Sequence, residues 1–294
     1  MIPKTFDYRV PSSIGEAIGL LSENEGSKVL AGGQSLLPMM KLRLAAPSVV
    51  VDISALPGLS YIRDAGDHIA IGALTSHDSL ENDKLIRERF PLITDAVAGI
   101  GDQQVRNLGT IGGSACHGDP AGDLPTALLV ADAQFVVEGR KGRRVVQASD
   151  FFLDLFTTAV GHDELLAEVR LPYLPRRSAS AYMKHAVRHE GFGIAMVGTA
   201  LTFDDADLCA RARIGVGAAG PTPLRASSAE KYLAGKTIDE ASIAEAALRV
   251  AGEADPPQDM HGSREYRLGV IRALTKSSLK LAMRRAAMRG AGEN

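Results

Sequence analysis

Two glycine pairs, each beside hydroxyl or amide side chains, are the residues of this chain best suited to holding a ligand. One lies in residues 31–35 (Ala-Gly-Gly-Gln-Ser) and the other in residues 110–114 (Thr-Ile-Gly-Gly-Ser). Glycine accepts positive φ values and lets backbone N–H groups approach a ligand without an intervening Cβ atom. Successive N–H groups in such a turn bind anions. Two such turns predict an extended ligand with several phosphates, such as a dinucleotide, although either turn alone also fits a tight structural connection.

The second glycine pair belongs to a polar stretch, residues 103–125, that also contains His117, Asp119 and Asp123. A loop of this length and polarity is more often functional than structural. Asp123 precedes a helical segment, so it either caps that helix or accepts a hydrogen bond from a ribose hydroxyl. Asp119 and Asp123 have no further Asp or His cluster near them in sequence, so no metal site is expected.

Other patterns in the chain predict no catalytic group. Cys116 and His117 are adjacent, and neighbouring side chains in an extended stretch point to opposite sides, which disfavours a catalytic dyad. Residues 215–220 match G-x-G-x-x-G, but Pro221 follows at once and opposes the helix that a dinucleotide fingerprint requires. Lys184 is either a surface lysine on a strand or a cation that reaches the ligand from a second domain.

The elements that would position these residues predict an α+β chain. Helical spacing begins at residue 14, and a short strand at 28–31 runs into the first glycine pair. The other expected helices cover residues 36–44, 79–90, 91–100, 124–131, 239–252 and 263–289. The other expected strands cover residues 48–53, 61–71 (a hairpin), 133–137, 144–147, 165–171, 195–203 and 210–218.

Length and composition limit the class of protein. A chain of 294 residues predicts about two domains, and a formal net charge of −2 gives no field for nucleic acid. The two cysteines, Cys116 and Cys209, are too few for a disulfide framework and fit a reducing compartment. We expect no membrane span, because no apolar run approaches the ~18 residues required. The N-terminus has no secretory pattern, so a cytoplasmic location is expected.

Four segments, in chain order, resemble the flavoprotein (medium) subunit of molybdenum hydroxylases, the family of carbon monoxide dehydrogenase and of the FAD domain of xanthine dehydrogenase. They are AGGQSLLPMMKLR (31–43), QQVRNLGTIGGSACHGDPAGDLP (103–125), ELLAEVRLPY (164–173) and AYMKHAVR (181–188). The resemblance covers nearly the whole chain. It implies an α+β fold in which residues 1–175 form a two-subdomain FAD-binding domain of the vanillyl-alcohol-oxidase (PCMH) type. The implied subdomains are about 1–55 and 56–175, and residues 176–294 form a C-terminal α+β domain of the carbon-monoxide-dehydrogenase flavoprotein type.

The resemblance also implies that the FAD pyrophosphate lies between the two glycine pairs. Ile100 falls where some members place an aromatic residue beside the isoalloxazine ring, and Phe192 is the alternative contact. Ser114 replaces an asparagine that is common in the family, which weakens or replaces one hydrogen bond. The residues expected to bind FAD are Val29, Leu30, Ala31, Gly32, Gly33, Gln34, Ser35, Leu36, Ile100, Thr110, Ile111, Gly112, Gly113, Ser114, His117, Asp119, Asp123, Leu166 and Lys184.

The implied function is that of an FAD-dependent electron-transfer subunit in a molybdenum hydroxylase complex. It would take electrons from a [2Fe-2S] subunit and pass them to an external acceptor. An iron–sulfur cluster needs about four cysteines, so the [2Fe-2S] clusters are expected in a small subunit and the molybdopterin cofactor in a large subunit, assembled as a dimer of heterotrimers. Two alternatives stay open: a self-contained FAD-dependent oxidoreductase of the same fold, and a non-enzymatic module that binds a nucleotide or another protein.

Overall fold

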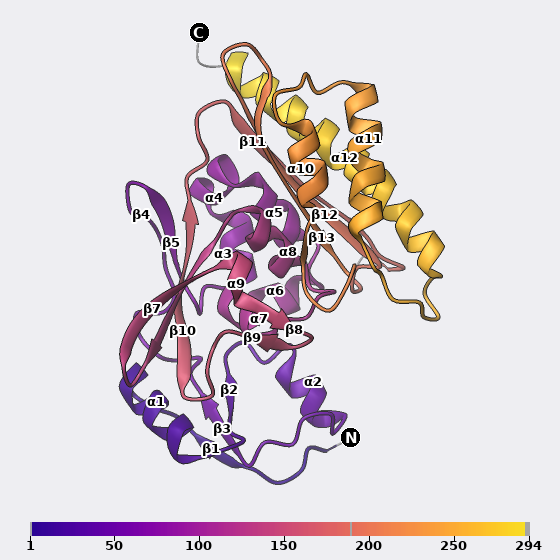
Figure 1. Ribbon diagram of the computed structural model, residues 1–294. Coiled ribbons are helices and arrows are strands. Elements are labelled where there is room, and N and C mark those ends of the chain that lie inside the picture. The colour runs from indigo at the N-terminus through magenta and orange to yellow at the C-terminus, as the bar shows by residue number, and fades with distance from the viewer. Residues whose placement is uncertain (1, 189, 292–294) are drawn as a thin grey trace.

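The structure is a computed structural model that describes residues 2–188 and 190–291 (Figure 1). Its strands are β1 (Asp7–Arg9), β2 (Lys28–Leu30), β3 (Val49–Asp52), β4 (Ile62–Asp64), β5 (His68–Gly72), β6 (Gln134–Gly139), β7 (Gly142–Gln147), β8 (Phe152–Asp154), β9 (Thr157–Thr158), β10 (Glu164–Pro172), β11 (Ser178–His185), β12 (Ala195–Phe203), β13 (Cys209–Gly217) and β14 (Leu224–Arg225). Its helices are α1 (Ile14–Glu23), α2 (Leu36–Lys41), α3 (His77–Asn82), α4 (Lys84–Arg89), α5 (Pro91–Ala98), α6 (Gln103–Leu108), α7 (Ile111–His117), α8 (Asp123–Val130), α9 (Ala148–Phe151), α10 (Ser227–Leu233), α11 (Glu240–Glu253) and α12 (Arg264–Ala291).

A small parallel sheet begins the chain, with strand order β1-β3-β2. Helix α1 starts at Ser13, whose side chain accepts a hydrogen bond from the Glu16 N–H, and it buries Ala17 and Leu21 in the core formed with β3. Strand β2 pairs with β3 up to Leu30, immediately before the first glycine pair. The sheet therefore fixes the position at which that glycine-rich turn begins.

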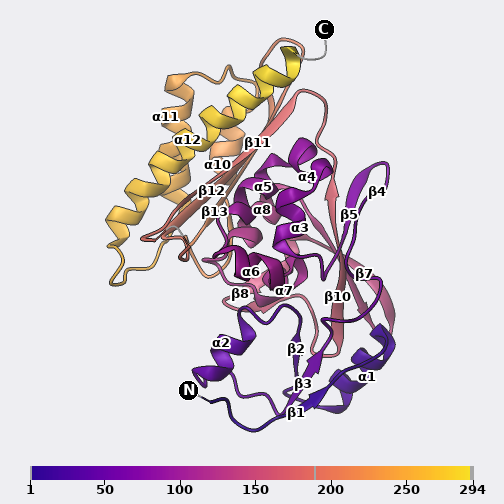
Figure 2. The ribbon, with the colours of Figure 1, turned by 180° about the vertical axis from the view of Figure 1, so that it is seen from behind.

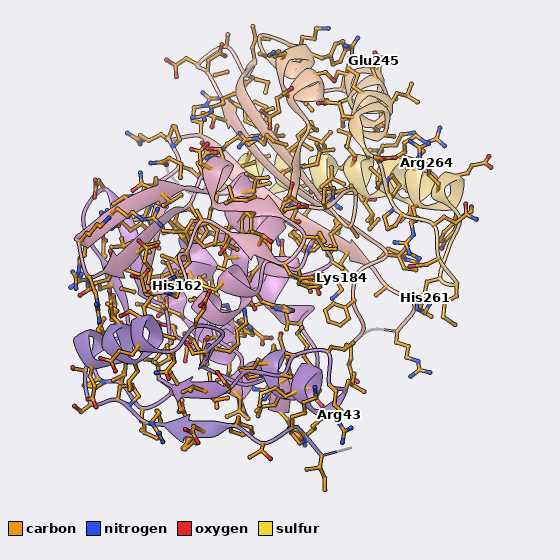
Figure 3. All side chains as sticks on the ribbon, turned by 60° about the horizontal axis from the view of Figure 1, so that its bottom comes forward. Arg43, His162, Lys184, Glu245, His261 and Arg264 are labelled. Carbon is orange, nitrogen blue, oxygen red and sulfur yellow. The ribbon has the colours of Figure 1, made fainter. Side chains whose placement is uncertain are left out.

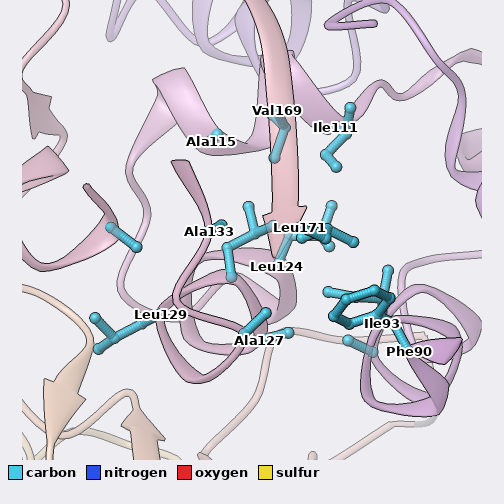
Figure 4. Packing of buried hydrophobic residues seen from close by; sticks show 14 of the residues in the cluster. Phe90, Ile93, Ile111, Ala115, Leu124, Ala127, Leu129, Ala133, Val169 and Leu171 are labelled. Carbon is cyan, nitrogen blue, oxygen red and sulfur yellow. The ribbon is translucent and has the colours of Figure 1, made fainter. Parts of the chain in front are cut away.

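An antiparallel sheet of order β4-β5-β10-β6-β7 lies along one side of the molecule, and helices α3 to α8 pack beside it in the middle (Figure 1). The largest apolar core joins this sheet to α5, α7 and α8. Figure 4 shows part of this core, with Phe90, Ile93, Ile111, Ala115, Leu124, Ala127, Leu129, Ala133, Val169 and Leu171 labelled. Burying these side chains stabilises the fold by roughly 1.5–3 kcal/mol for each large one and holds α7 against β10.

The last part of the chain is a second antiparallel sheet, of order β11-β12-β13-β14. Helix α12 packs on one face of this sheet, and α5 and α8 pack on the other, as Figure 2 shows from behind. The Arg285 guanidinium of α12 donates to both carboxylate oxygens of Asp95 in α5, at 2.6 and 2.9 Å, and to the Ser180 carbonyl at 2.8 Å. Three elements distant in sequence are thereby joined. No helix among the described residues is long and apolar enough to cross a membrane.

Three expectations about helices are corrected by the structure. The predicted helix 79–90 is interrupted at Asp83, which ends α3 and caps α4 by accepting from the Ile86 N–H. The predicted helix 36–44 ends at Lys41, and Arg43 adopts a positive φ of 62°. The stretch 103–125 is not one loop, because α6, α7 and the start of α8 occupy most of it.

The ion pair between α12 and α5 gives a first prediction. Replacing Arg285→Ala leaves the Asp95 carboxylate, only 23% exposed, without its cation, so the free energy of unfolding is expected to fall by about 1.5–3 kcal/mol. The matched control is Arg284→Ala, one position earlier at an exposed site of the same helix. Denaturant unfolding measures both variants, and equal losses in the two would contradict the assignment.

Candidate functional site

The first glycine pair lies in a turn between β2 and α2. Gly33 adopts a positive φ of 74°, and a Cβ atom at Gly32 would lie 1.9 Å from the Leu108 carbonyl oxygen at the end of α6. Glycine is therefore required at both positions, by conformation at one and by close approach at the other. The backbone N–H groups of residues 32–36 form no hydrogen bond with any described residue. The turn thus offers a row of unpaired donors of the kind that binds an anion.

The second glycine pair lies inside α7, and its N–H groups are already paired. Thr110 begins the helix and accepts from the Gly113 N–H at 3.0 Å. The N–H groups of Ile111 and Gly112 donate to the carbonyls of Thr75 and Ala73, at 3.0 and 2.9 Å. The expectation of an anion-binding turn of free N–H groups at this pair is therefore wrong. Its glycines serve close packing, since a Cβ atom at Gly112 would lie 2.6 Å from the Ala73 oxygen.

The two glycine pairs nevertheless lie side by side. A Cβ atom at Gly113 would lie 3.9 Å from the Cβ of Ala31, and the close approach of Gly32 to Leu108 holds the first turn against the segment before α7. The structure therefore brings residues 31–35 and 110–114 together, as the sequence analysis expected. The polar groups that the two segments contribute differ, because the first supplies backbone N–H groups and the second supplies hydroxyl side chains.

A second group of polar residues surrounds Asp123. Its carboxylate accepts from the Lys184 ammonium at 2.8 Å and from the Tyr182 hydroxyl at 3.0 Å, and Lys184 also donates to the Gly99 carbonyl at 2.8 Å. Burial raises the pKa of Asp123, while the Lys184 ammonium and the Tyr182 hydroxyl oppose that shift. Lys184, near the centre of Figure 3, brings its charge from β11 to the first turn of α8.

Two expectations about these residues are wrong: that Asp123 caps α8, and that Lys184 is a surface lysine. The residue that caps α8 is Gly122 rather than Asp123, whose carboxylate faces Tyr182 and Lys184 instead. Lys184 is not a surface lysine, because its side chain is only 11% exposed. The sequence offered no sign of Tyr182, which reaches Asp123 because it lies two residues before Lys184 on the same face of β11.

Ile100 lies beside this group of residues, next to Gly99 in sequence and packed at the edge of the main core. Arg106 holds the local backbone by donating to the carbonyls of Ile100 and Gly101, at 3.2 Å each. The alternative flavin contact, Phe192, is 71% exposed.

His77 was missed as a member of the site. Its ring is 2% exposed, its Nε2 lies 3.2 Å from the Ser114 hydroxyl, and its backbone N–H donates to the Gly109 carbonyl at 2.9 Å. Burial, with the nearby Arg106 charge, lowers the pKa of His77 to about 4, so the ring is neutral at neutral pH. A lone histidine outside any metal-binding spacing carries no signal in the sequence.

The other expected contacts occupy separate places. His117 is the last residue of α7 and its ring lies 5.1 Å from Phe156, and Asp119 follows the helix and accepts from the Ala121 N–H. Leu166 is buried in the main core on β10. Cys116 lies within α7, and burial raises the pKa of its thiol to about 12, which disfavours the thiolate that a nucleophile requires. The described residues contain no cluster of His, Cys, Asp or Glu able to hold a metal ion.

Comparisons with known proteins match this architecture throughout its length. Residues 4–174 match the model for the FAD binding domain in molybdopterin dehydrogenase, and residues 180–282 match the CO dehydrogenase flavoprotein C-terminal domain. The 6-hydroxypseudooxynicotine dehydrogenase complex subunit alpha of Paenarthrobacter nicotinovorans is 38% identical over 97% of each chain. The carbon monoxide dehydrogenase medium chain of Hydrogenophaga pseudoflava is 36% identical over 98% of this chain and 100% of that one.

Solved structures show the same fold. A structure of carbon monoxide dehydrogenase from Hydrogenophaga pseudoflava, which lacks the Mo-pyranopterin moiety of its cofactor, superimposes with a TM-score of 0.94 at 37% identity, covering 97% of this chain and 99% of that chain. Quinoline 2-oxidoreductase from Pseudomonas putida 86 superimposes with a TM-score of 0.92 at 31% identity, covering 97% and 99%. The protein is thus an oxidoreductase subunit with an FAD-binding domain.

More specifically, the chain belongs to the FAD-binding medium subunits of the molybdenum hydroxylase family, of the type found in carbon monoxide dehydrogenase. The expected family and α+β fold class are confirmed. The residues present also fit FAD, because the unpaired N–H groups of residues 32–36 suit a pyrophosphate and Gly32 keeps their approach free of a Cβ atom.

The close approach at Gly32 gives a second prediction. Gly32→Ala places a methyl group into the Leu108 carbonyl, which must displace the turn or the end of α6. We expect a loss of about 1–3 kcal/mol in unfolding free energy together with loss of bound FAD. The control Gly19→Ala, in α1 with nothing near its Cβ position, is expected to keep FAD and gain up to about 1 kcal/mol. Retention of FAD by the Gly32 variant would contradict the assignment of this turn.

The neutral state of His77 gives a third prediction, on pH. Its pKa of about 4 in the folded chain lies below the value of 6.5 for a free histidine, so the unfolded chain takes up this proton first as the pH falls. The stabilisation present above pH 6.5 is therefore lost on the way down to about pH 4. Relative to His77→Gln, wild type is expected to lose about 2 kcal/mol of unfolding free energy between about pH 7 and about pH 5. If the unfolding free energies of wild type and His77→Gln changed equally with pH, the ring would not be buried as described.

Proposed function

We propose that this chain is the FAD-carrying electron-transfer subunit of a molybdenum hydroxylase complex, taking electrons from a [2Fe-2S] subunit and passing them to an external acceptor. When bound, FAD supplies the redox chemistry, and the protein supplies binding, orientation and electrostatics. The observation that carries the proposal is the row of unpaired N–H groups at residues 32–36, held by the close approach of Gly32 to Leu108.

Two places in the structure would hold different parts of the cofactor. The N–H groups of residues 32–36 and the Ser114 hydroxyl would bind the pyrophosphate, the anionic centre of FAD. Asp123 would accept a hydrogen bond from a ribose hydroxyl, and Lys184, which donates to the Gly99 carbonyl beside Ile100, would lie near the isoalloxazine. The remaining expected contacts are part of the proposal as supporting positions around these two places: Val29, Leu30, Ala31, Thr110, Ile111, Gly112, Gly113, His117, Asp119 and Leu166.

The proposal extends to the assembly. The chain has two free cysteines, fewer than the ~4 that one cluster needs, so the [2Fe-2S] clusters and the molybdopterin cofactor belong to an iron–sulfur small subunit and a large subunit. We infer a dimer of such heterotrimers in the cytoplasm, a reducing compartment that suits free thiols. Within the chain we place the domain boundary at residues 175–176, between the end of β10 and the start of β11.

The experiment that tests this assembly is affinity purification of the tagged chain from its native host. The account expects two further chains, with iron and molybdenum, to elute with it and FAD. A lone FAD-containing chain that oxidises an organic substrate without other subunits would contradict the proposal and support the self-contained oxidoreductase. A chain that neither carries nor takes up flavin would support the non-enzymatic binding module.

The Asp123–Lys184 pair gives a fourth prediction. Lys184→Met removes the cation from a carboxylate that is 6% exposed, and an uncompensated buried charge costs about 3 kcal/mol or more. Adding Asp123→Asn removes that charge, so the double variant is expected to be more stable than Lys184→Met. The double variant is still expected to bind FAD weakly. Lys276→Met, at an exposed position of α12, is the control expected to change neither property. Thermal unfolding and FAD titration measure the effects, and a double variant no more stable than Lys184→Met would refute the pairing.

A further inference from the structure

The ring of His77 has two nitrogens in different surroundings, and only one of them has a partner. Nε2 lies 3.2 Å from the Ser114 hydroxyl oxygen, whereas Nδ1 is buried without a hydrogen-bond partner among the described residues. The His77 backbone N–H donates to the Gly109 carbonyl, and the ring packs so closely on Gly109 that a Cβ atom there would lie 2.8 Å from it. In this position the ring offers Nε2 to Ser114 and leaves Nδ1 without a partner among the described residues.

Only one placement of the ring proton avoids a buried donor without an acceptor. A neutral imidazole carries its proton on one nitrogen. With the proton on Nδ1, a buried N–H would lack an acceptor, which folded proteins rarely tolerate. With the proton on Nε2, Nδ1 keeps an unpaired acceptor, which folded proteins tolerate more often than an unpaired buried N–H. The structure therefore favours Nε2–H, which donates to the Ser114 oxygen.

Because His77 donates to Ser114, the Ser114 hydroxyl is left as a free hydrogen-bond donor. Once its oxygen accepts from His77, its own O–H proton has no acceptor among the described residues and is free to be donated. Ser114 is only partly buried, and it follows Gly113, which lies beside Ala31 in the first glycine turn. The free hydroxyl thus belongs to the segment that lies beside the first glycine turn, whose residues 32–36 have unpaired N–H groups.

We propose that His77 is a positioning residue for the cofactor: it donates from Nε2–H to the Ser114 oxygen and so directs the Ser114 hydroxyl proton to an FAD phosphate oxygen. This inference rests on the proposed FAD site. His77 touches no cofactor atom itself and acts through Ser114.

The test is FAD affinity in four variants of the full chain, with riboflavin, which lacks phosphates, as a second ligand. His77→Leu and Ser114→Ala are each expected to weaken FAD binding about tenfold, the size of one hydrogen bond to a charged group. The double variant is expected to bind FAD no more weakly than either single variant, because both lose the same contact. His77→Gln, whose amide can donate to Ser114, is expected to stay near wild type. Riboflavin affinity is expected to be unchanged throughout.

Several results would overturn the proposal. Effects of His77→Leu and Ser114→Ala that multiply in the double variant would show independent roles, and equal weakening of riboflavin would show a merely structural one. If His77→Leu does not fold, the tautomer of His77 in the wild-type protein provides a second test. ¹⁵N spectra of histidine-labelled wild type are expected to show His77 protonated on Nε2, and protonation on Nδ1 would refute the proposal. Absence of FAD binding by wild type would refute the proposed function and this inference together, whereas an unchanged FAD affinity in His77→Leu would refute only the inference.

Discussion

The close approach of Gly32 to the Leu108 carbonyl is the constraint on which the candidate site depends. It presses the turn after β2 against the end of α6, and no side chain larger than glycine fits there. In this turn the N–H groups of residues 32–36 form no hydrogen bond with the described residues and are available to a ligand. The same contact places the turn beside α7, so a short parallel sheet and a helix far along the chain border one site.

The second constraint is electrostatic and joins the last part of the chain to the same region. Lys184 comes from β11, and its ammonium is held between the Asp123 carboxylate of α8 and the Gly99 carbonyl after α5. Asp95 of α5 pairs with Arg285 of α12, so two ion pairs fix α5 and α8 against the second antiparallel sheet. The position of Lys184, and of any ligand held there, would therefore depend on how α5 and α8 pack against the second antiparallel sheet.

Much of this arrangement could be predicted from the sequence. The features that depend on contacts between distant residues could not. The glycine-rich turn at residues 31–35 was predicted correctly because a strand ends directly before it. The segment 103–125 was predicted as a loop because glycines and polar residues disfavour helices, yet the caps at Asp102 and Thr110 start two short helices. Propensity cannot show that the N–H groups of Ile111 and Gly112 pair with residues far away in the chain. His77 escaped notice for the same reason, since only the fold brings it to Ser114.

Hydrogen exchange of the backbone amides, with and without FAD, would show whether residues 32–36 hold the cofactor phosphates. Without FAD, the amides of residues 32–36 have no hydrogen-bond acceptor in the described structure, whereas those of residues 111–114 are already paired. We expect FAD to slow exchange strongly in residues 32–36 and to change it little in residues 111–114. Binding of FAD that leaves the exchange of residues 32–36 unchanged would show that the cofactor phosphates are held elsewhere.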